Sequence, residues 1–144
     1  MTPEEMEIAR AFVACKDWRW LPGMLLRDLT RSKKGRVHKV GNDWVVYFGI
    51  NSESRYRCET VGYSVVPDIT DPATLGCILQ VVRDATGDPD LHVRCIHPYT
   101  PSYTAASPYA VYSGRGQRLT ERHNSEAESL LQVLQAAPQY IQEI

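Results

Sequence analysis

The sequence predicts an α+β fold in which two to three helices pack on one face of an antiparallel β-sheet of about five to seven strands. Two observations lead to this class. Apolar residues recur at helical spacing near both ends of the chain and in its middle. Between these segments lie runs of alternating or β-branched residues, separated by short turn signals, as in an antiparallel meander.

The first helix is expected directly after the N-terminus and has about 12 residues. Thr2 suits the N-cap, Pro3 the first helical position, and Glu5 the closing position of a capping box. A turn at Pro22-Gly23 precedes residues 24–66, which predict an antiparallel meander. Its expected strands are residues 24–26, 36–40, 44–48 and 56–61, with a loop at 32–35.

The second half of the chain begins with the clearest helix, over residues 72–86. Asp71 provides the N-cap, Pro72 the first position, and Gly87 the end. Alternating residues then predict three strands and one long loop, which are strands 91–96, 109–112 and 118–120 and the loop 97–108. A last helix is expected to begin at a cap formed by Asn124 or Ser125 and to break at Pro138.

The composition is that of one folded domain spanning residues 1–144. The chain is 43% hydrophobic and 23% charged, close to the average for globular proteins. Sixteen basic and seventeen acidic residues give a net charge of −1, which excludes a uniformly basic nucleic-acid coat and an acidic DNA mimic. No apolar run reaches the roughly 18–20 residues of a membrane span, and the N-terminus is acidic, so we expect a cytoplasmic protein without membrane contact.

Motifs of common catalytic sites are absent from the sequence. It contains no nucleotide-binding glycine motif, no zinc-protease motif, no serine-hydrolase elbow and no EF-hand loop. His92, Cys95 and His97 are the best metal-ligand candidates, with His123 or His38 as a distant third ligand. A buried thiol beside a surface histidine explains the same residues more simply. We therefore predict no metal site and no cofactor, and favour binding over catalysis.

Several cysteines and carboxylates have plain structural explanations. The four cysteines lack a CxxC pair, and a chain without a secretion signal favours free thiols. The acidic residues around the middle helix are expected to cap helices and turns, and they are Asp68, Asp71, Asp84, Asp88 and Asp90.

One short segment is strongly basic. Six cations lie within thirteen residues, and Asp28 is the one acidic residue in this segment. The cations are Arg27, Arg31, Lys33, Lys34, Arg36 and Lys39. Such a segment can contact phosphates, and the nearby Trp44, Tyr47 and Tyr56 can stack on bases. The alternative is a solvated edge strand that lysines protect from aggregation.

Aromatic residues provide a second candidate surface. Trp18 and Trp20 are separated by one residue. Four tyrosines cluster around the loop 97–108, and they are Tyr99, Tyr103, Tyr109 and Tyr112, of which the first three are the predicted protein contacts. Tyrosine and tryptophan are favoured at protein interfaces. The alternatives are core packing for the tryptophans and a loop that packs on itself for the tyrosines.

Three segments resemble a group of small uncharacterised proteins of tailed bacteriophages and prophages. They are Trp18–Met24 (WRWLPGM), Pro67–Leu79 (PDITDPATLGCIL) and Ser125–Leu131 (SEAESLL). The resemblance implies a phage accessory protein in the bacterial cytoplasm and carries no activity or site. By analogy we expect a non-enzymatic protein that binds a host or phage protein, for example a host defence complex, in the manner of an anti-CRISPR. The alternatives are a nucleic-acid-binding module that uses residues 27–39 and a small metal- or ligand-binding enzyme.

Overall fold

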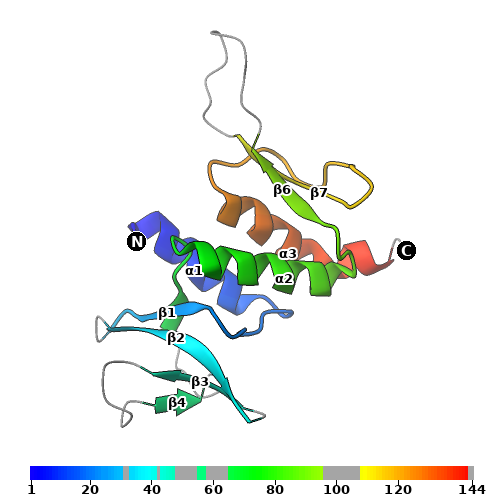
Figure 1. The fold of residues 1–144 in the computed structure, drawn as a ribbon. Helices are drawn as coiled ribbons and strands as arrows, with labels where there is room; N and C mark the ends of the chain where they lie inside the picture. The colour runs from blue at the N-terminus through cyan, green and yellow to red at the C-terminus, as the bar shows by residue number, and fades with distance from the viewer. Residues whose placement is uncertain (31–32, 42, 48–54, 58–64, 96–107, 143–144) are drawn as a thin grey trace. The chain divides into compact units, whose positions relative to one another are not determined.

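Three helices and seven strands make up the described part of the computed structural model, which confirms the α+β class (Figure 1). The strands lie in two antiparallel sheets, one of five strands and one of two. The prediction of a single sheet is therefore wrong in this detail, because β6 (His92–Cys95) and β7 (Tyr109–Tyr112) form a sheet of their own. The structure describes residues 1–30, 33–41, 43–47, 55–57, 65–95 and 108–142.

The chain divides into two compact units. One comprises Met1–Ala14 and Trp18–Cys77, and the other comprises Cys15–Asp17 and Ile78–Ile144. Helix α2 (Pro72–Thr86) contributes residues to both units. The division does not test whether each unit folds separately, so a single domain spanning residues 1–144 stays a prediction.

Helix α1 (Pro3–Ala14) opens the first unit as the sequence predicts. The Thr2 N–H donates to Glu5 Oε1 at 2.8 Å, and the Glu5 N–H donates to Thr2 Oγ1 at 3.1 Å. These reciprocal bonds form the predicted capping box, and hydrogen bonding from Thr2 lowers the pKa of Glu5. Ala9 and Phe12 are the buried residues of α1, which packs against β5 (Val65–Pro67).

The five-stranded sheet of the first unit has the order β4-β3-β2-β1-β5. The first four strands follow one another as the predicted meander, and they are β1 (Leu25–Asp28), β2 (Lys33–Val40), β3 (Asp43–Tyr47) and β4 (Arg55–Arg57). Strand β5 is not among the predicted strands. It returns to pair with β1, and places Val66 opposite Arg27.

Strand β2 begins earlier than the sequence predicts. Residues 32–35 are expected to form a loop, whereas Lys33 pairs with Asp28 and Gly35 pairs with Leu26. Lysine and glycine are poor strand formers, so local propensity favours a loop here. The backbone ladder with β1 and the burial of Gly35 override that preference.

Buried apolar residues form the interior of the first unit. Val37 and Val46 are direct neighbours across β2 and β3, and both are fully buried. The buried apolar residues of this unit are Ala9, Phe12, Met24, Leu26, Val37, Val45, Val46, Val65, Val66 and Ile69. Burial of such residues is the main stabilising contribution in a domain of this size.

Helix α2 has the predicted limits at both ends. Asp71 precedes it, Pro72 is its first residue, and Gly87 follows it with a φ of 71°. A positive φ suits glycine because it has no Cβ, and a glycine of this kind commonly terminates a helix.

Helix α3 (Glu126–Gln142) packs against β6 and β7 in the second unit. The Glu128 N–H donates to Ser125 Oγ at 3.2 Å, so Ser125 is the N-cap. The helix continues through Pro138, and the predicted break there is wrong. Proline removes one backbone hydrogen bond, but the burial of Leu134 and Ala137 in the preceding turn favours continued helix.

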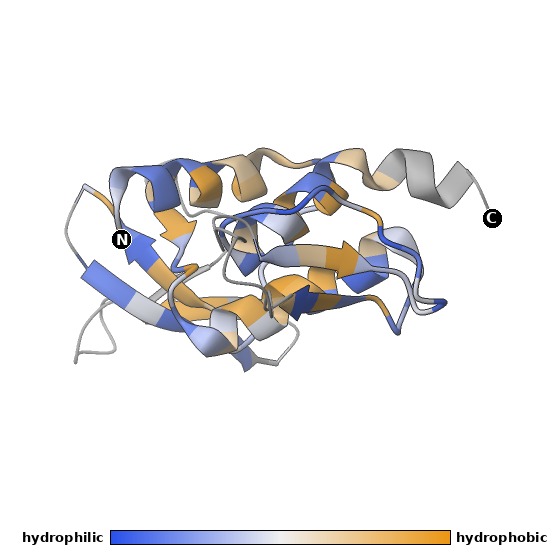
Figure 2. Ribbon diagram, turned by 90° about the horizontal axis from the view of Figure 1, so that it is seen from above, coloured by the Kyte–Doolittle hydropathy of each residue, from blue (hydrophilic) through white to orange (hydrophobic). Residues whose placement is uncertain are grey.

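The predicted strand over residues 118–120 reduces to one isolated bridge, between Tyr112 and Arg118. The helical ribbons alternate between hydrophobic and hydrophilic residues along their turns (Figure 2), as amphipathic helices do. The buried apolar residues of the second unit are Ile78, Val81, Val82, Leu91, Ala110, Val111, Ala127, Leu130, Val133, Leu134 and Ala137. None of the described helices combines the length and apolar character needed to cross a membrane.

Candidate functional site

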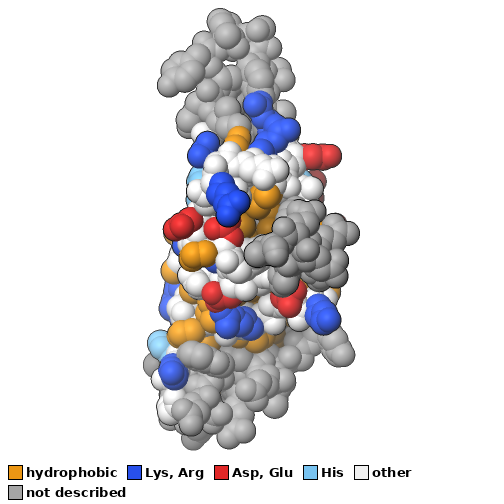
Figure 3. Space-filling model, turned by 90° about the vertical axis from the view of Figure 1, so that its right-hand side faces the viewer, with side chains coloured by type: hydrophobic (Ala, Val, Ile, Leu, Met, Phe, Trp, Pro, Cys, Tyr) orange, Lys and Arg blue, Asp and Glu red, His pale blue; other side chains and the backbone are white. Residues whose placement is uncertain are grey.

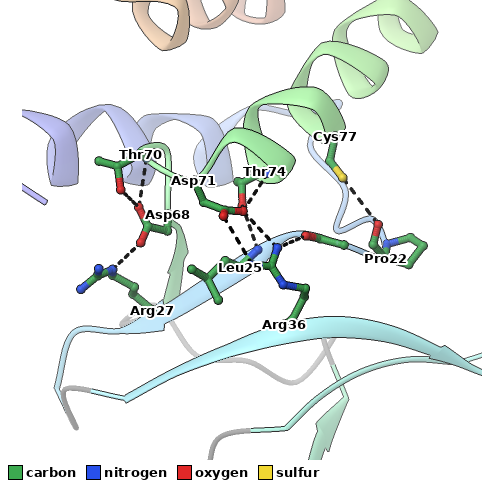
Figure 4. Close-up of polar contacts among 10 residues, drawn as sticks. Pro22, Leu25, Arg27, Arg36, Asp68, Thr70, Asp71, Thr74 and Cys77 are labelled. Carbon is green, nitrogen blue, oxygen red and sulfur yellow. Dashed lines mark hydrogen bonds and ion pairs between the residues drawn. The ribbon is translucent and has the colours of Figure 1, made fainter.

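Two of the six predicted anion-contacting residues bind carboxylates of their own unit (Figure 4). Arg27 Nε donates to Asp68 Oδ2 at 2.6 Å. Arg36 Nη1 donates to Asp71 Oδ2 at 3.0 Å and to the Gly23 carbonyl at 2.6 Å. The basic segment is therefore partly neutralised within the fold.

Asp71 has the predicted capping role. Its Oδ2 accepts hydrogen bonds from the Thr74 N–H at 3.0 Å and from the Thr74 hydroxyl at 2.8 Å. Thr74 Oγ1 in turn accepts the Leu25 N–H at 2.8 Å, which ties the start of α2 to β1 (Figure 4). Asp71 thus satisfies the Thr74 N–H in the first turn of α2, and Thr74 anchors that turn to the sheet.

Both carboxylates have lowered pKa values. Burial alone would raise the pKa of Asp68, but hydrogen bonds from Thr70 and Arg27 outweigh burial and lower it. The pKa of Asp71 is lowered first by the hydrogen bond from Arg36 and then by those from Thr74, against the effect of burial. Both groups are therefore held in the ionised form, as structural partners of the arginines.

The remaining basic residues separate into two locations. Lys33 and Lys34 are exposed at the start of β2, where they and Arg27 line a hollow of about 280 Å³. Lys39 is exposed near the other end of β2. Arg31 lies outside the described residues, and base stacking by Trp44, Tyr47 and Tyr56 stays a prediction. Basic and acidic side chains are interspersed over the face drawn in Figure 3.

The two tryptophans form an aromatic cluster with α1. Trp18 contacts Phe12 with ring centroids 5.8 Å apart, and it meets Trp20 edge-on at 5.1 Å. Both tryptophans are half-buried. The indole N–H of Trp18 is buried without a hydrogen-bond partner among the described residues. Packing accounts for much of their surface, which agrees with the core interpretation, and a role in protein contact stays a prediction.

The tyrosines of the long loop lie mostly beyond the described residues. Tyr99 and Tyr103 belong to the range that the structure does not describe. Tyr109 begins β7, directly opposite Cys95 on β6. The pKa of Tyr109 is raised, first by the charge of the Cys95 thiolate and then by burial. Cys95 is exposed, so the expectation of a buried thiol at this position is wrong.

The β6–β7 hairpin carries an ordered group of three side chains that the site prediction does not contain as a unit. His92 is opposite Tyr112, and Arg94 lies two residues further along the same face. Arg94 Nε donates to His92 Nε2 at 3.0 Å, and the guanidinium carbon is 4.3 Å from the centroid of the Tyr112 ring. The His92 and Tyr112 rings stack with centroids 6.1 Å apart and planes inclined by 20°. We call this set the Arg94–His92–Tyr112 face.

The hydrogen-bonding roles of the two His92 ring nitrogens follow from their partners. Arginine Nε can only donate, so His92 Nε2 is an acceptor and the ring proton is on Nδ1. Nδ1 lies 3.0 Å from the Asp90 carbonyl, to which it donates. Both ring nitrogens are therefore already engaged within the protein.

The metal-ligand candidates do not gather into a cluster in the described structure. His92 and Cys95 have opposite orientations on β6, and His97 lies outside the described residues. His123 Nε2 lies 2.5 Å from Gln132 Oε1. Within the described ranges, no group of three or more His, Cys, Asp or Glu side chains is placed to hold a metal ion. Of the four cysteines, Cys15, Cys77 and Cys95 are described, and these three form no disulfide with one another.

A second hollow, of about 520 Å³, lies in the second unit between the turn after α2 and the turn after β7. Asp88 joins these turns, because its carboxylate accepts the Asp90 N–H at 3.1 Å and the Gly114 N–H at 2.9 Å. A Cβ at Gly114 would come within 2.7 Å of Asp90 Cβ, so only glycine fits there without a shift. Asp88 thus acts in turn formation, as the sequence predicts.

Sequence reasoning finds the strands of the Arg94–His92–Tyr112 face but not the face itself. The alternation in residues 91–96 and 109–112 is a visible signal for two strands. The register that sets His92 against Tyr112 depends on pairing across a long connection, and no local pattern encodes it.

Comparison with known protein families, with curated proteins and with solved structures finds no match for the chain.

Proposed function

We propose that the protein is a non-enzymatic binding protein whose partner is another protein, contacted through the Arg94–His92–Tyr112 face. The observation that supports this most directly is the stacking of an exposed arginine over a tyrosine ring. Arginine and tyrosine are enriched where interfaces concentrate their binding energy.

The geometry of the face favours binding at low entropic cost. Arg94 is held by its Nε bond to His92, and the Tyr112 ring packs against both the guanidinium and the imidazole. Ordering a free side chain at an interface costs about 0.5–1.5 kcal/mol, and side chains that are already ordered avoid part of that cost. Among the described residues, Nε is the only Arg94 nitrogen with a hydrogen-bond partner, so the terminal nitrogens remain for a partner's carboxylate or carbonyl oxygens.

The biological setting we propose follows from the sequence resemblance. The protein acts as an accessory protein of a bacteriophage or prophage in the bacterial cytoplasm, and its partner is a host or phage protein. Inhibition of a host defence complex, in the manner of an anti-CRISPR, is the specific form of this proposal, and it rests on the resemblance and on analogy.

The test is capture of the partner from a nuclease-treated bacterial lysate, followed by affinity measurement with the purified partner. Arg94→Ala and Tyr112→Leu should each weaken binding by at least about tenfold, as interface hot spots do. Arg115→Ala is the matched control, because Arg115 is an exposed arginine of the same unit that is not part of the face. Its affinity should stay within about twofold of wild type.

Two results would contradict the proposal. The first is a partner that binds Arg94→Ala and Tyr112→Leu as tightly as wild type. The second is capture of proteins only through nucleic acid, with every partner lost after nuclease treatment. Melting curves of each variant distinguish a lost contact from a lost fold.

A further inference from the structure

The loop end of the β1–β2 pair forms a hollow with a concentration of basic side chains. The hollow has a volume of about 280 Å³ and is lined by Arg27, Asp28, Leu29, Lys33 and Lys34. At about 30 Å³ per molecule, this volume corresponds to about nine waters, which is enough for a phosphate group and part of its hydration shell. Three of the five lining residues are cations.

Asp68 fixes the Arg27 side chain through its Nε atom. Only Nε bonds to Asp68, and the two terminal nitrogens point away from that carboxylate (Figure 4). The side chain is 37% exposed, whereas the Asp68 side chain is 3% exposed. The terminal nitrogens present parallel N–H donors, the arrangement that binds phosphate oxygens in a bidentate manner.

Lys33 and Lys34 supply two further charges from the neighbouring strand. Lys34 is the register partner of Arg27, and Lys33 is the partner of Asp28. Both lysines are exposed, and neither forms an ion pair with a described carboxylate. Asp28 directs Oδ1 to Thr30, accepting its N–H at 3.0 Å and its hydroxyl at 2.7 Å.

Other cations of the basic segment do not share this arrangement. Arg36 uses its terminal nitrogens on Asp71 and on the Gly23 carbonyl. Lys39 is six positions beyond Lys33 on β2, a distance of about 20 Å along an extended strand. The structure thus distinguishes Arg27, Lys33 and Lys34 from the other cations of the basic segment.

We propose that this hollow binds phosphate groups of a nucleic-acid backbone. The site belongs to the first unit and is separate from the protein-binding face proposed on β6 and β7. An open site with cations from two adjacent strands suits a chain of phosphates that passes over it. A membrane surface fits less well, because Leu29 is the only apolar residue among the described lining residues and is half-buried, which leaves little apolar area to insert into lipid.

The test measures binding of the full chain to a fluorescent oligothymidylate of about 20 nucleotides and to a duplex of the same length. Fluorescence anisotropy is recorded between about 50 and 200 mM salt. Wild type should bind at the low end of this range. The variant Lys33→Gln/Lys34→Gln should bind at least about tenfold more weakly, and its salt slope should be smaller by about 1.4 to 1.8, the value for two lost phosphate contacts.

Lys39→Gln is the matched control, since it removes one lysine charge from the same strand outside the hollow. Its affinity should stay within about twofold of wild type. Inorganic phosphate at millimolar concentration should compete with the oligonucleotide, because it offers the same chemical group.

Three outcomes would overturn the proposal. They are no oligonucleotide binding by wild type at low salt, an unchanged affinity in the double lysine variant, and a loss in Lys39→Gln equal to that in the double variant. Binding to vesicles that contain phosphatidylserine, without binding to either oligonucleotide, would assign the hollow to a membrane instead. Melting curves show whether each variant is folded. We expect the double lysine variant to fold, because Lys33 and Lys34 are exposed and their side chains form no hydrogen bond or ion pair with a described residue.

Discussion

Asp71→Ala removes the side chain that starts α2 and anchors it to the sheet. In the native protein its carboxylate accepts the Thr74 N–H and hydroxyl at 3.0 and 2.8 Å, and it pairs with Arg36 at 3.0 Å. All three interactions end at one side chain that is only 17% exposed. A single substitution therefore removes a helix cap, a hydroxyl acceptor and an ion-pair partner together.

The expected loss of stability is the sum of three modest contributions. A lost N-cap costs about 1 kcal/mol. The lost hydroxyl hydrogen bond costs about 0.5 kcal/mol. The Arg36 side chain is 39% exposed, so solvent screens the ion pair and its loss costs about 0.5 kcal/mol. The total of about 2 kcal/mol corresponds to a decrease in Tm of about 4–8 °C for a chain of this length.

Thermal and urea unfolding of wild type, Asp71→Ala and Asp71→Asn would measure this loss. Asparagine can still cap the helix but has no charge, so Asp71→Asn should lose less than half as much stability as Asp71→Ala. If Asp71→Ala melted within about 1 °C of wild type, the inferred anchoring of α2 would be wrong. Equal losses in the alanine and asparagine variants would show that charge, and not capping, accounts for the stabilisation.

Three further predictions concern stability in acid, the close packing of Gly114 against Asp90, and the apolar core. Because the folded-state pKa values of Asp68 and Asp71 are lowered, their stabilisation is complete above the unfolded value of about 4 and declines as the pH falls through the folded values; Tm measured against pH should drop in acid, and Asp68→Asn should flatten that drop. Gly114→Ala should cost about 1–3 kcal/mol, since its Cβ would press on Asp90; a Tm equal to that of wild type would disprove the close approach. Leu130→Ala, at a position 1% exposed, should cost about 2–5 kcal/mol in urea unfolding, and a cost below 1 kcal/mol would place Leu130 outside the core.

The sequence predicts best those elements whose limits are set by local chemistry. Helix α2 has an N-cap residue directly before it, a proline at its first position and a glycine directly after it, and its predicted and observed ranges agree. Strand β7 is likewise found where β-branched and aromatic residues predict it. At Lys33 local preference favours a loop, but pairing with β1 makes the residue part of a strand. At Pro138 local preference favours a helix end, but the packing of α3 continues the helix.

The candidate sites depend on pairings that lie far apart in the sequence. Arg27 meets Asp68 across 41 positions, and Arg36 meets Asp71 across 35. The sequence alone counts both arginines as available to a ligand. The fold distinguishes them, because Arg36 binds Asp71 through its terminal nitrogens whereas Arg27 binds Asp68 through Nε. The stacking of Arg94 on Tyr112 is hidden for the same reason.

The continuity of α2 has a consequence for how this protein can be divided. The boundary between the two units falls after Cys77, inside a helix of 15 residues. A cut there would leave pieces of six and nine residues, and isolated helices shorter than about 12 residues are marginal in water. The second piece would still carry the buried Ile78 and Val82, but on only nine helical residues. Truncations and gene fusions that keep the fold should therefore leave residues 72–86 intact. The two units share this helix, so neither can be cut from the other at their boundary without dividing it.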